Sequence, residues 1–301
     1  MSPPPVAGTA AGYRSGILMM AGACLGWSTS GLIVRHTSIA NGWEVTFWRS
    51  LFCCVTLSAW LLVRYGGGAA ARVRAIGRIG VVSALLFAVM FTAFLLALTR
   101  TTVANTQVLV SVAPLFAAIA GFAFQGERVP ARTWCAIVCA FGGILVMFSG
   151  ALGGGAMSGN LFALLVPLAF AAQVVLLKRT GTALDMLPAV LLGGVFSALL
   201  TLPLALPLSA SAHDLALLAL MGAVQLALPC VLMTWAAPLL SAAEAGLIQL
   251  VETICAPLWV WLAVGEEPGA ATLLGGGIVI AALVVNETLG LRSTRAARVA
   301  Q

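Results

Sequence analysis

Long apolar stretches separated by short polar turns run along almost the whole chain. A helix needs roughly 20 mostly apolar residues to cross a bilayer, and ten stretches come close to this length or exceed it. Residues 238–241 leave barely a turn between two of them, so nine spans is the main alternative. The ten predicted spans, numbered 1 to 10, are Ile17–Val34, Val45–Val63, Ile79–Leu98, Val103–Phe124, Ala131–Phe148, Asn160–Leu177, Met186–Leu208, Leu215–Ala237, Ala242–Val264 and Ala270–Leu289.

The pattern of spans and turns occurs twice. The turn GERVP at residues 126–130 returns 139 residues later as GEEP at residues 265–268, and residues 25–37 align with residues 168–180 at a shift of 143. Each half then holds five spans, and because five is odd, the second half enters the membrane from the opposite side. A chance match between apolar segments is the alternative. Inverted repeats are typical of secondary transporters, whose substrate site lies near the midplane between the repeats.

This duplication predicts an all-α polytopic membrane protein with ten transmembrane helices in two inverted five-helix repeats. The boundaries follow from the spans. We expect a cytoplasmic N-terminal tail at 1–16, a first repeat at 17–148, a periplasmic linker at 149–159, a second repeat at 160–289 and a cytoplasmic basic tail at 290–301.

The orientation follows from the basic residues, which gather on the cytoplasmic side of membrane proteins. With the N-terminus inside, only Arg35 and Arg100 fall outside, and Arg49 lies within span 2. The other twelve of the fifteen fall inside, so both termini are expected in the cytoplasm. These twelve are Arg14, Arg64, Arg72, Arg74, Arg78, Arg128, Arg132, Lys178, Arg179, Arg292, Arg295 and Arg298.

The composition supports a membrane protein and excludes several other classes. The chain is 61% hydrophobic and 8% charged, whereas soluble domains are about 25% charged. The net charge of +6 does not indicate a nucleic-acid partner, because the basic residues lie between apolar spans. The seven cysteines fall inside spans without a CxxC, and there are only two histidines. We therefore expect no metal site and no cofactor.

The chain also lacks the motifs of an enzyme. Its single lysine, Lys178, is not part of a GK pair, which excludes a P-loop ATPase. Its two aspartates, Asp185 and Asp214, lie far apart, so they form no aspartate-rich metal motif. No set of His, Asp and Ser has the context of a catalytic triad, and we expect a protein that is not an enzyme.

The signature around the repeated turn resembles a known family. Pro114 is followed thirteen residues later by Glu127 within APLFAAIAGFAFQGERV, and VETICAPLWVWLAVGEEP in the second half is similar, although Thr253 replaces the first proline. The sequence resembles the drug/metabolite transporter superfamily of the EamA type over almost its whole length. The resemblance implies a small-molecule exporter, and the ten-span amino-acid exporters, including those for aromatic amino acids, are the nearest analogy.

Polar residues inside the spans are candidates for the transport pathway, because an ionisable group in hydrocarbon is costly unless it is paired or faces water. Glu252 lies deepest, with Glu244 and Gln249 on neighbouring turns of span 9, while Asn105 and Gln107 occupy span 4. Asn105 matches Glu244 under the shift of 139. A Glu252 that merely bonds a neighbouring helix is the alternative to a pathway residue.

Other candidates lie in spans 1, 2 and 6. Trp27 and Trp48 are candidate walls of a substrate cavity, with lipid contact or packing as the alternative. Ser30 offers a hydroxyl group beside Trp27, and Gln173 occupies the position in the second repeat that matches Ser30. Arg49 is the one basic residue inside a span, and a single cation argues against phosphorylated substrates.

Two prolines in the signature spans, Pro114 and Pro257, are candidate hinges, because proline frees a backbone carbonyl and permits bending. A static kink is the alternative.

The sequence as a whole predicts a secondary transporter that exports small apolar metabolites by alternating access, amino acids first among them, and that acts as a monomer in the lipid bilayer. The substrate-binding candidates are Trp27, Ser30, Trp48, Asn105, Gln107, Gln173 and Gln249, and the coupling candidates are Glu252, Arg49 and Glu244. One alternative is a cation or drug/proton antiporter that uses Glu252, and a non-transporting membrane scaffold is a more remote one.

Overall fold

The computed structural model describes residues 10–126, 128–151, 156–180, 186–240 and 242–299. These residues form helices, and no strand occurs among them. Ten helical segments are long and apolar enough to cross a membrane, which confirms ten spans rather than nine. Glu127 of the signature and residues 152–155 of the expected linker lie outside the described residues.

Six of the ten spans are single helices. They are α3 (Gly42–Tyr65), α5 (Gly77–Arg100), α8 (Ala131–Ala151), α9 (Met157–Thr180), α10 (Met186–Ala205) and α13 (Ala242–Val264), which form spans 2, 3, 5, 6, 7 and 9. Span 10 is the start of a longer helix, α14 (Ala270–Val299), which continues through most of the segment expected to be a basic tail. Arginines are good helix formers and are favourable at a helix C-terminus, so a helix can continue beyond its apolar part.

The other three spans are interrupted. Span 1 consists of α1 (Ala10–Ser28) and α2 (Ser30–Arg35), and span 4 of α6 (Val103–Ser111) and α7 (Ala113–Gln125). Span 8 consists of α11 (Ala212–Leu220), a π-helical segment (Met221–Ala227) and α12 (Leu228–Ala236), with a 3₁₀ turn at Ala237–Leu239. Pro114 in span 4 and Pro229 in span 8 stand just after the irregular residues, because proline removes a hydrogen-bond donor from the helix.

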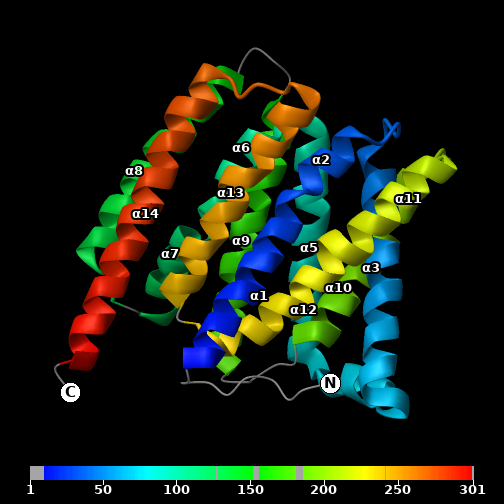
Figure 1. The fold of residues 1–301 in the computed structure, drawn as a ribbon, viewed down its shortest axis with the longest axis horizontal. Helices are drawn as coiled ribbons and strands as arrows, with labels where there is room; N and C mark the ends of the chain where they lie inside the picture. Colours follow the sequence, from blue (N-terminus) through cyan, green and yellow to red (C-terminus); the bar gives the residue numbers. More distant parts are fainter. Residues whose placement is uncertain (1–9, 127, 152–155, 181–185, 241, 300–301) are drawn as a thin grey trace.

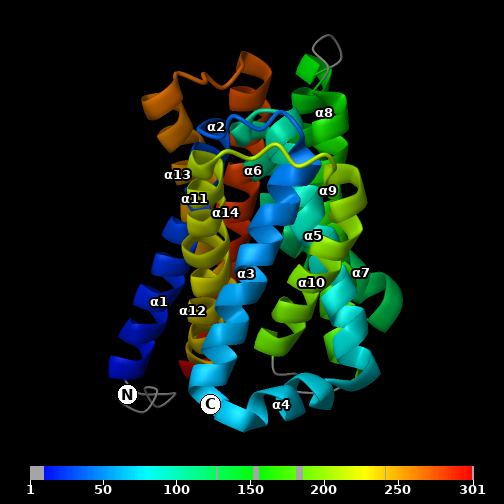
Figure 2. The same ribbon diagram turned by 90° about the vertical axis from the view of Figure 1, so that its right-hand side faces the viewer.

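A short helix that the apolar pattern did not predict joins spans 2 and 3. It comprises a 3₁₀ turn (Gly66–Gly68) and α4 (Ala69–Ala75). Figure 2 shows α4 lying across one end of the molecule, and Figure 1 shows that α1 begins and α14 ends at this same end. We call it the α4 end. The turn between α13 and α14 lies at the opposite end.

The helix contacts follow the relation between the two repeats. Helix α1 of the first repeat packs against α12 and α13 of the second repeat. The matching helix of the second repeat, α9, packs against α5, α6 and α7 of the first. Spans 2 and 7 pack against each other as α3 and α10, and spans 5 and 10 as α8 and α14. Each contact is converted into another by exchanging the repeats, as expected for two inverted five-helix repeats.

The pair formed by α8 and α14 stands at one side of the molecule (Figure 1). Its close approach depends on Gly143 and Gly275, because a Cβ atom added to Gly143 would lie 2.5 Å from the carbonyl oxygen of Gly275. Gly142 and Gly277 on the same helices face open space. Small residues that let two helices approach are a common basis of packing in membranes, so these two helices have the features of a supporting pair.

Candidate functional site

A cavity of about 240 Å³ lies between the two repeats. Spans from both repeats form its wall, namely spans 1 to 4 of the first and spans 6 and 8 to 10 of the second. On α13 the lining residues lie in the half nearer the α4 end, and on α14 they reach Glu287, whereas Arg49 of α3 and Gln107 of α6 lie nearer the opposite end. The cavity therefore spans the middle of the molecule and extends at Gly246 and Glu287 towards the α4 end.

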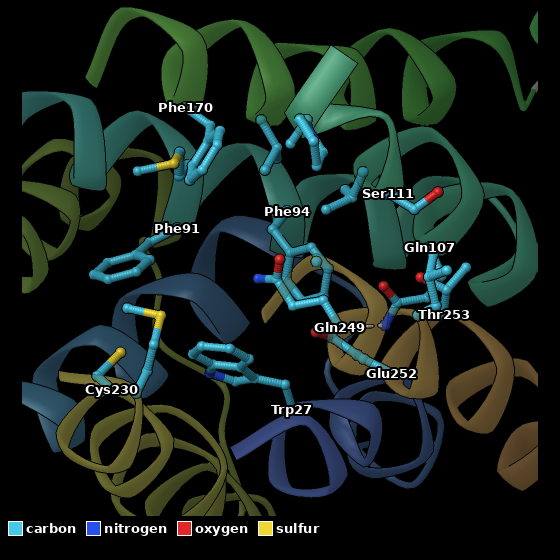
Figure 3. Close-up of a pocket in the computed structure, with 18 of the residues that line it drawn as sticks. Trp27, Phe91, Phe94, Gln107, Ser111, Phe170, Cys230, Gln249, Glu252 and Thr253 are labelled. Atoms are coloured by element: carbon cyan, nitrogen blue, oxygen red, sulfur yellow. Dashed lines mark hydrogen bonds between the residues drawn. The ribbon is translucent and has the colours of Figure 1, made fainter. Parts of the chain in front are cut away.

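One side of the cavity is polar and centres on Glu252 of α13. Gln107 of α6 donates a hydrogen bond from Nε2 to Glu252 Oε1 at 3.3 Å. Gln249 and Thr253, one turn or less away on α13, also line the cavity (Figure 3). The thiol of Cys24 on α1 is close enough to Glu252 to interact electrostatically. Spans 4 and 9, which correspond to each other in the two repeats, thus meet at this carboxyl group.

Aromatic residues line much of the rest of the cavity. Trp27 of α1 lies across from Phe91 and Phe94 of α5 and Phe170 of α9 (Figure 3). Phe87 and Phe91, one turn apart on α5, pack with their ring centroids 5.8 Å apart and their ring planes tilted by 31°. An apolar wall with a few polar groups at fixed positions is the usual form of a small-molecule site.

Arg49 of α3 reaches the edge of the cavity but is almost completely covered, with 1% of its surface exposed. Its Nη2 donates to the carbonyl oxygen of Phe91 at 2.8 Å, and the guanidinium lies 5.7 Å from the centre of the Phe91 ring. Among the described residues it forms no ion pair with Glu252. The guanidinium thus fixes α3 to α5 and offers little surface to a solute.

The structure brings six of the twelve predicted site residues together at this cavity. They are Trp27, Arg49, Gln107, Pro114, Gln249 and Glu252. Pro114 stands directly after the break between α6 and α7, so the interruption of span 4 is itself part of the cavity wall.

Three of the other predicted residues lie in helix contacts elsewhere. Trp48 packs against Phe52, with the rings stacked at 6.0 Å, and its Nε1 donates to Glu44 Oε1 at 3.4 Å. Gln173 of α9 donates to Ser83 Oγ of α5. Asn105 accepts from Thr272 Oγ1 of α14 at 2.6 Å and donates to Asn160 of α9, so it joins three spans.

The remaining three also lie outside the cavity wall. Ser30 is buried at the start of α2, and its Oγ has no hydrogen-bond partner within the described part of the chain. Glu244, at the start of α13, accepts a hydrogen bond from the hydroxyl of Tyr13 at 3.1 Å. Pro257 lies inside α13, one turn beyond Thr253, and the helix continues through it.

The sequence did not single out several residues that line the cavity. The phenylalanines of α5 and α9 carry no signal, because a phenylalanine that faces a cavity and one that faces lipid look alike in an apolar span. Gln225, in the π-helical segment of span 8, and Glu287 of α14 also line the cavity. Both are polar residues in apolar stretches, so the sequence could have indicated them. Gln225 donates from Nε2 to the carbonyl oxygen of Trp27 at 3.3 Å, so it supports the aromatic wall.

The end of the molecule opposite to α4 is tied together by an ion pair. Arg35 of α2 donates from Nε to Glu266 Oε2 at 2.6 Å, and its Nη1 and Nη2 donate to the carbonyl oxygens of Leu98 at 2.6 Å and Thr101 at 3.0 Å. Glu266 Oε1 accepts from the backbone N–H of Val103 at 2.8 Å. We call this set the Arg35–Glu266 clasp. It joins spans 1, 3 and 4 to the turn between spans 9 and 10.

Comparison with known proteins agrees with this architecture. The model of the EamA-like transporter family matches residues 14–149 and again residues 157–288. A solved structure titled "Crystal structure of protein" superposes with a TM-score of 0.63 at 16% sequence identity, over 93% of this chain and 98% of its own. At this identity the likeness concerns the fold alone. A search among curated proteins found no match.

Proposed function

Because the chain belongs to the EamA-like transporter family, a multi-pass membrane family that transports small solutes, we propose that it exports small, largely apolar metabolites, amino acids first among them. The observation that carries this proposal is the cavity between the repeats, which has an aromatic wall, a polar side at Glu252 and, among the described residues, no lining residue from the Arg35–Glu266 clasp. Transporters of this family are not enzymes.

The size and charge of the cavity favour such substrates. Its volume of about 240 Å³ falls below the range of about 300–1,000 Å³ that is typical for drug-sized ligands. Phosphorylated solutes are usually bound by several cationic donors, and the one arginine among the described lining residues, Arg49, is 1% exposed. A small solute with an apolar body therefore fits better than a sugar phosphate or a large drug.

Replacing Trp27 by alanine should reduce export while the amount of protein in the membrane stays the same. Truncating a tryptophan at a binding site costs about 2 kcal/mol or more, so we expect the apparent KM to rise roughly tenfold or more. The measurement is transport of labelled amino acids by proteoliposomes, with Trp48→Ala as the control because Trp48 packs outside the cavity. Robust uptake of a sugar phosphate by the unaltered protein would contradict the proposed substrate class.

Alternating access supplies the mechanism of the proposed export. The two repeats correspond to each other helix by helix, and the cavity extends towards one end while the Arg35–Glu266 clasp holds the other end together. Exchange of the roles of the repeats would close the α4 end and release the clasped end. The break before Pro114 lies in the cavity wall and is the proposed hinge in span 4. In span 9 the proposed hinge is Pro257, four residues beyond Thr253, which matches Pro114 in the second repeat.

A cation or drug/proton antiporter remains the second candidate function. The observation that favours it is Glu252, a partly buried carboxyl group in the cavity whose described hydrogen-bond partner is the neutral amide of Gln107. A carboxyl group at this depth marks a proton or cation pathway by default.

The proposed location is the inner membrane of a bacterium, with both termini and α4 in the cytoplasm. The test uses cysteines placed at Gly67 and Gly269 after the seven native cysteines are replaced. Both glycines are exposed, with nothing within 4 Å of an added Cβ atom. A membrane-impermeant maleimide should label Gly269→Cys in intact cells and Gly67→Cys only in opened cells. Labelling of Gly67→Cys from outside would reverse the proposed orientation and with it the direction of the cavity.

A further inference from the structure

The charged groups of the cavity are unevenly available to a solute. Two carboxyl groups line it, Glu252 in the middle and Glu287 towards the α4 end. Glu287 interacts electrostatically with Arg132, which is not among the lining residues. The arginine at the cavity, Arg49, has 1% of its surface exposed and donates to the carbonyl oxygen of Phe91. A solute in the cavity therefore meets acidic groups first, and their field favours a positive charge over a negative one.

Glu252 itself lacks a cationic partner among the described residues. Its Oε1 accepts a hydrogen bond from the neutral amide of Gln107, which fixes the orientation of the carboxyl group without balancing a charge. Buried charges in proteins are normally paired, and a hydrogen bond between ammonium and carboxylate is roughly twice as strong as one between neutral groups. An ammonium group is therefore the best complement to this position.

The walls on either side of Glu252 suit a cation as well. Trp27 lies beside it, and the rings of Phe91, Phe94 and Phe170 lie across the cavity (Figure 3). The face of an aromatic ring attracts an ammonium group, most strongly in the case of tryptophan and in desolvated sites. The same rings offer an apolar surface to the body of the solute.

A carboxylate in this cavity finds no exposed cationic donor among the described lining residues. The amide of Gln107 is directed to Glu252, the amide of Gln225 to the carbonyl oxygen of Trp27, and the hydroxyl of Ser111 to the carbonyl oxygen of Val108 at 2.7 Å. The amide of Gln249, the hydroxyl of Thr253 and the indole N–H of Trp27 are the neutral donors left in the described wall. The Nε of Arg49 has no hydrogen-bond partner among the described residues, but the side chain is almost completely covered. Separate neutral donors are a weaker site for a carboxylate than an exposed arginine, which binds it with two parallel hydrogen bonds.

We propose that the cavity recognises the amino group of its substrate at Glu252, Gln249 and Trp27 and does not require a carboxylate. Small apolar amines and amino-acid amides are then substrates that bind at least as tightly as the free amino acids. This inference rests on the proposed export of small metabolites and deepens it by naming the chemical group that the site binds.

The test measures binding of four related compounds to the purified full-length protein by calorimetry. They are phenylethylamine, phenylalaninamide, phenylalanine and 3-phenylpropionate, which share one ring and differ in their charged groups. We expect the amine and the amide to bind at least as tightly as phenylalanine. We expect 3-phenylpropionate to bind about tenfold more weakly or worse, because a site built for an amino group rejects an analogue without one.

Two variants connect this preference to the site. Glu252→Gln should cancel the advantage of the amine over 3-phenylpropionate, because the amide keeps the shape of the side chain and removes its charge. Glu244→Gln makes the same change two turns earlier on α13 and outside the cavity wall, and it should leave the preference as it is. A preference that persists in Glu252→Gln would overturn the assignment.

The results separate the inference from the proposed function. If proteoliposomes transport phenylalanine but phenylethylamine binds tenfold more weakly than phenylalanine, the carboxylate is recognised. The inference is then wrong while the export function stands. The inference is also wrong, and the export function also stands, if 3-phenylpropionate binds as tightly as phenylalanine. If none of the four compounds binds and no amino acid is transported, both the inference and the proposed substrate class are wrong.

Discussion

Replacing Glu252 by glutamine should abolish transport driven by a pH gradient and should leave the exchange of substrate for substrate intact at saturating concentration. Exchange of a proton for a solute needs a side chain in the cavity that binds and releases a proton. Glu252 is in that position, in the wall between the repeats and without an ion-pair partner among the described residues. Glutamine keeps the size of the side chain and a hydrogen bond with Gln107, but it does not titrate.

The groups that surround Glu252 decide how this result is interpreted. Cys24 of α1 lies close enough to interact with it electrostatically, Gln107 of α6 donates a hydrogen bond to it, and Arg49 and Glu287 line the same cavity. Arg49 is directed to α5, so it does not neutralise the carboxyl group as a structural partner would.

Proteoliposomes with an imposed pH gradient provide the measurement. Flux in Glu252→Gln should fall to the level of protein-free liposomes, whereas Glu252→Asp, which retains a titratable group, should keep part of it. If the glutamine variant responds to the gradient as the unaltered protein does, the protein is a facilitator or couples through another group. Glu252 would then serve only to bind substrate or to pack α13 against α6.

The sequence predicted the membrane architecture because the apolar periodicity of a span is a local property. Ten spans and their division into two repeats follow from the lengths of the apolar stretches and from the turns that recur after 139 residues. The breaks in spans 1 and 8 and the surface helix α4 were not predicted. The π-helical segment at Met221–Ala227 packs against α3, a contact between distant parts of the chain that no window of the sequence contains.

The site could be predicted only where a polar residue interrupts an apolar span. Glu252, Gln107 and Gln249 were found in this way, and all three line the cavity. The same signal also selected Asn105 and Gln173, whose partners lie on other helices and satisfy them away from the cavity. A sequence shows that a polar residue needs a partner, but it does not show whether that partner is a solute or another helix.

Carboxyl groups at the clasped end illustrate the same limit. Glu44 is fully buried, and its partners lie in a distant loop, where the backbone N–H groups of Ser209 and Ala210 donate to it at 2.7 Å and 2.9 Å. Its burial therefore reflects a contact within the protein and no site for a solute. In the sequence Arg35 appeared as an outer basic residue and Glu266 as part of the repeated turn. Their pairing joins positions 231 residues apart.

Replacing Glu266 by glutamine should open the clasped end of the molecule. The Glu266 carboxylate binds Arg35 and also the backbone N–H of Val103 at the start of α6, where the helix dipole favours a negative charge. The Arg35 guanidinium binds carbonyl oxygens at the end of α5, where the dipole favours a positive charge. Each charge is thus stabilised by its partner and by a helix end.

The size of the effect follows from these contacts. Hydrogen bonds to charged groups contribute about 1.5–3 kcal/mol each, so losing one shifts the ratio of clasped to open molecules by roughly 10-fold to 100-fold. The probe is a cysteine at Ala104, which is buried one residue beyond Val103 on α6. A membrane-impermeant maleimide added outside should label it faster by about this factor in Glu266→Gln than in the otherwise unaltered protein.

The neighbouring Glu267 supplies the matched control, because it is exposed and the same change there should leave the labelling rate as it is. Exchanging the two charges, Arg35→Glu with Glu266→Arg, tests the role of the helix ends. A simple ion pair would be restored by the exchange, but here the new glutamate would face the carbonyl oxygens of Leu98 and Thr101, and the new arginine would face the N–H of Val103. We therefore expect the double variant to label as fast as Glu266→Gln. Slow labelling in Glu266→Gln would show that packing alone closes this end, and the clasp would then have no part in alternating access.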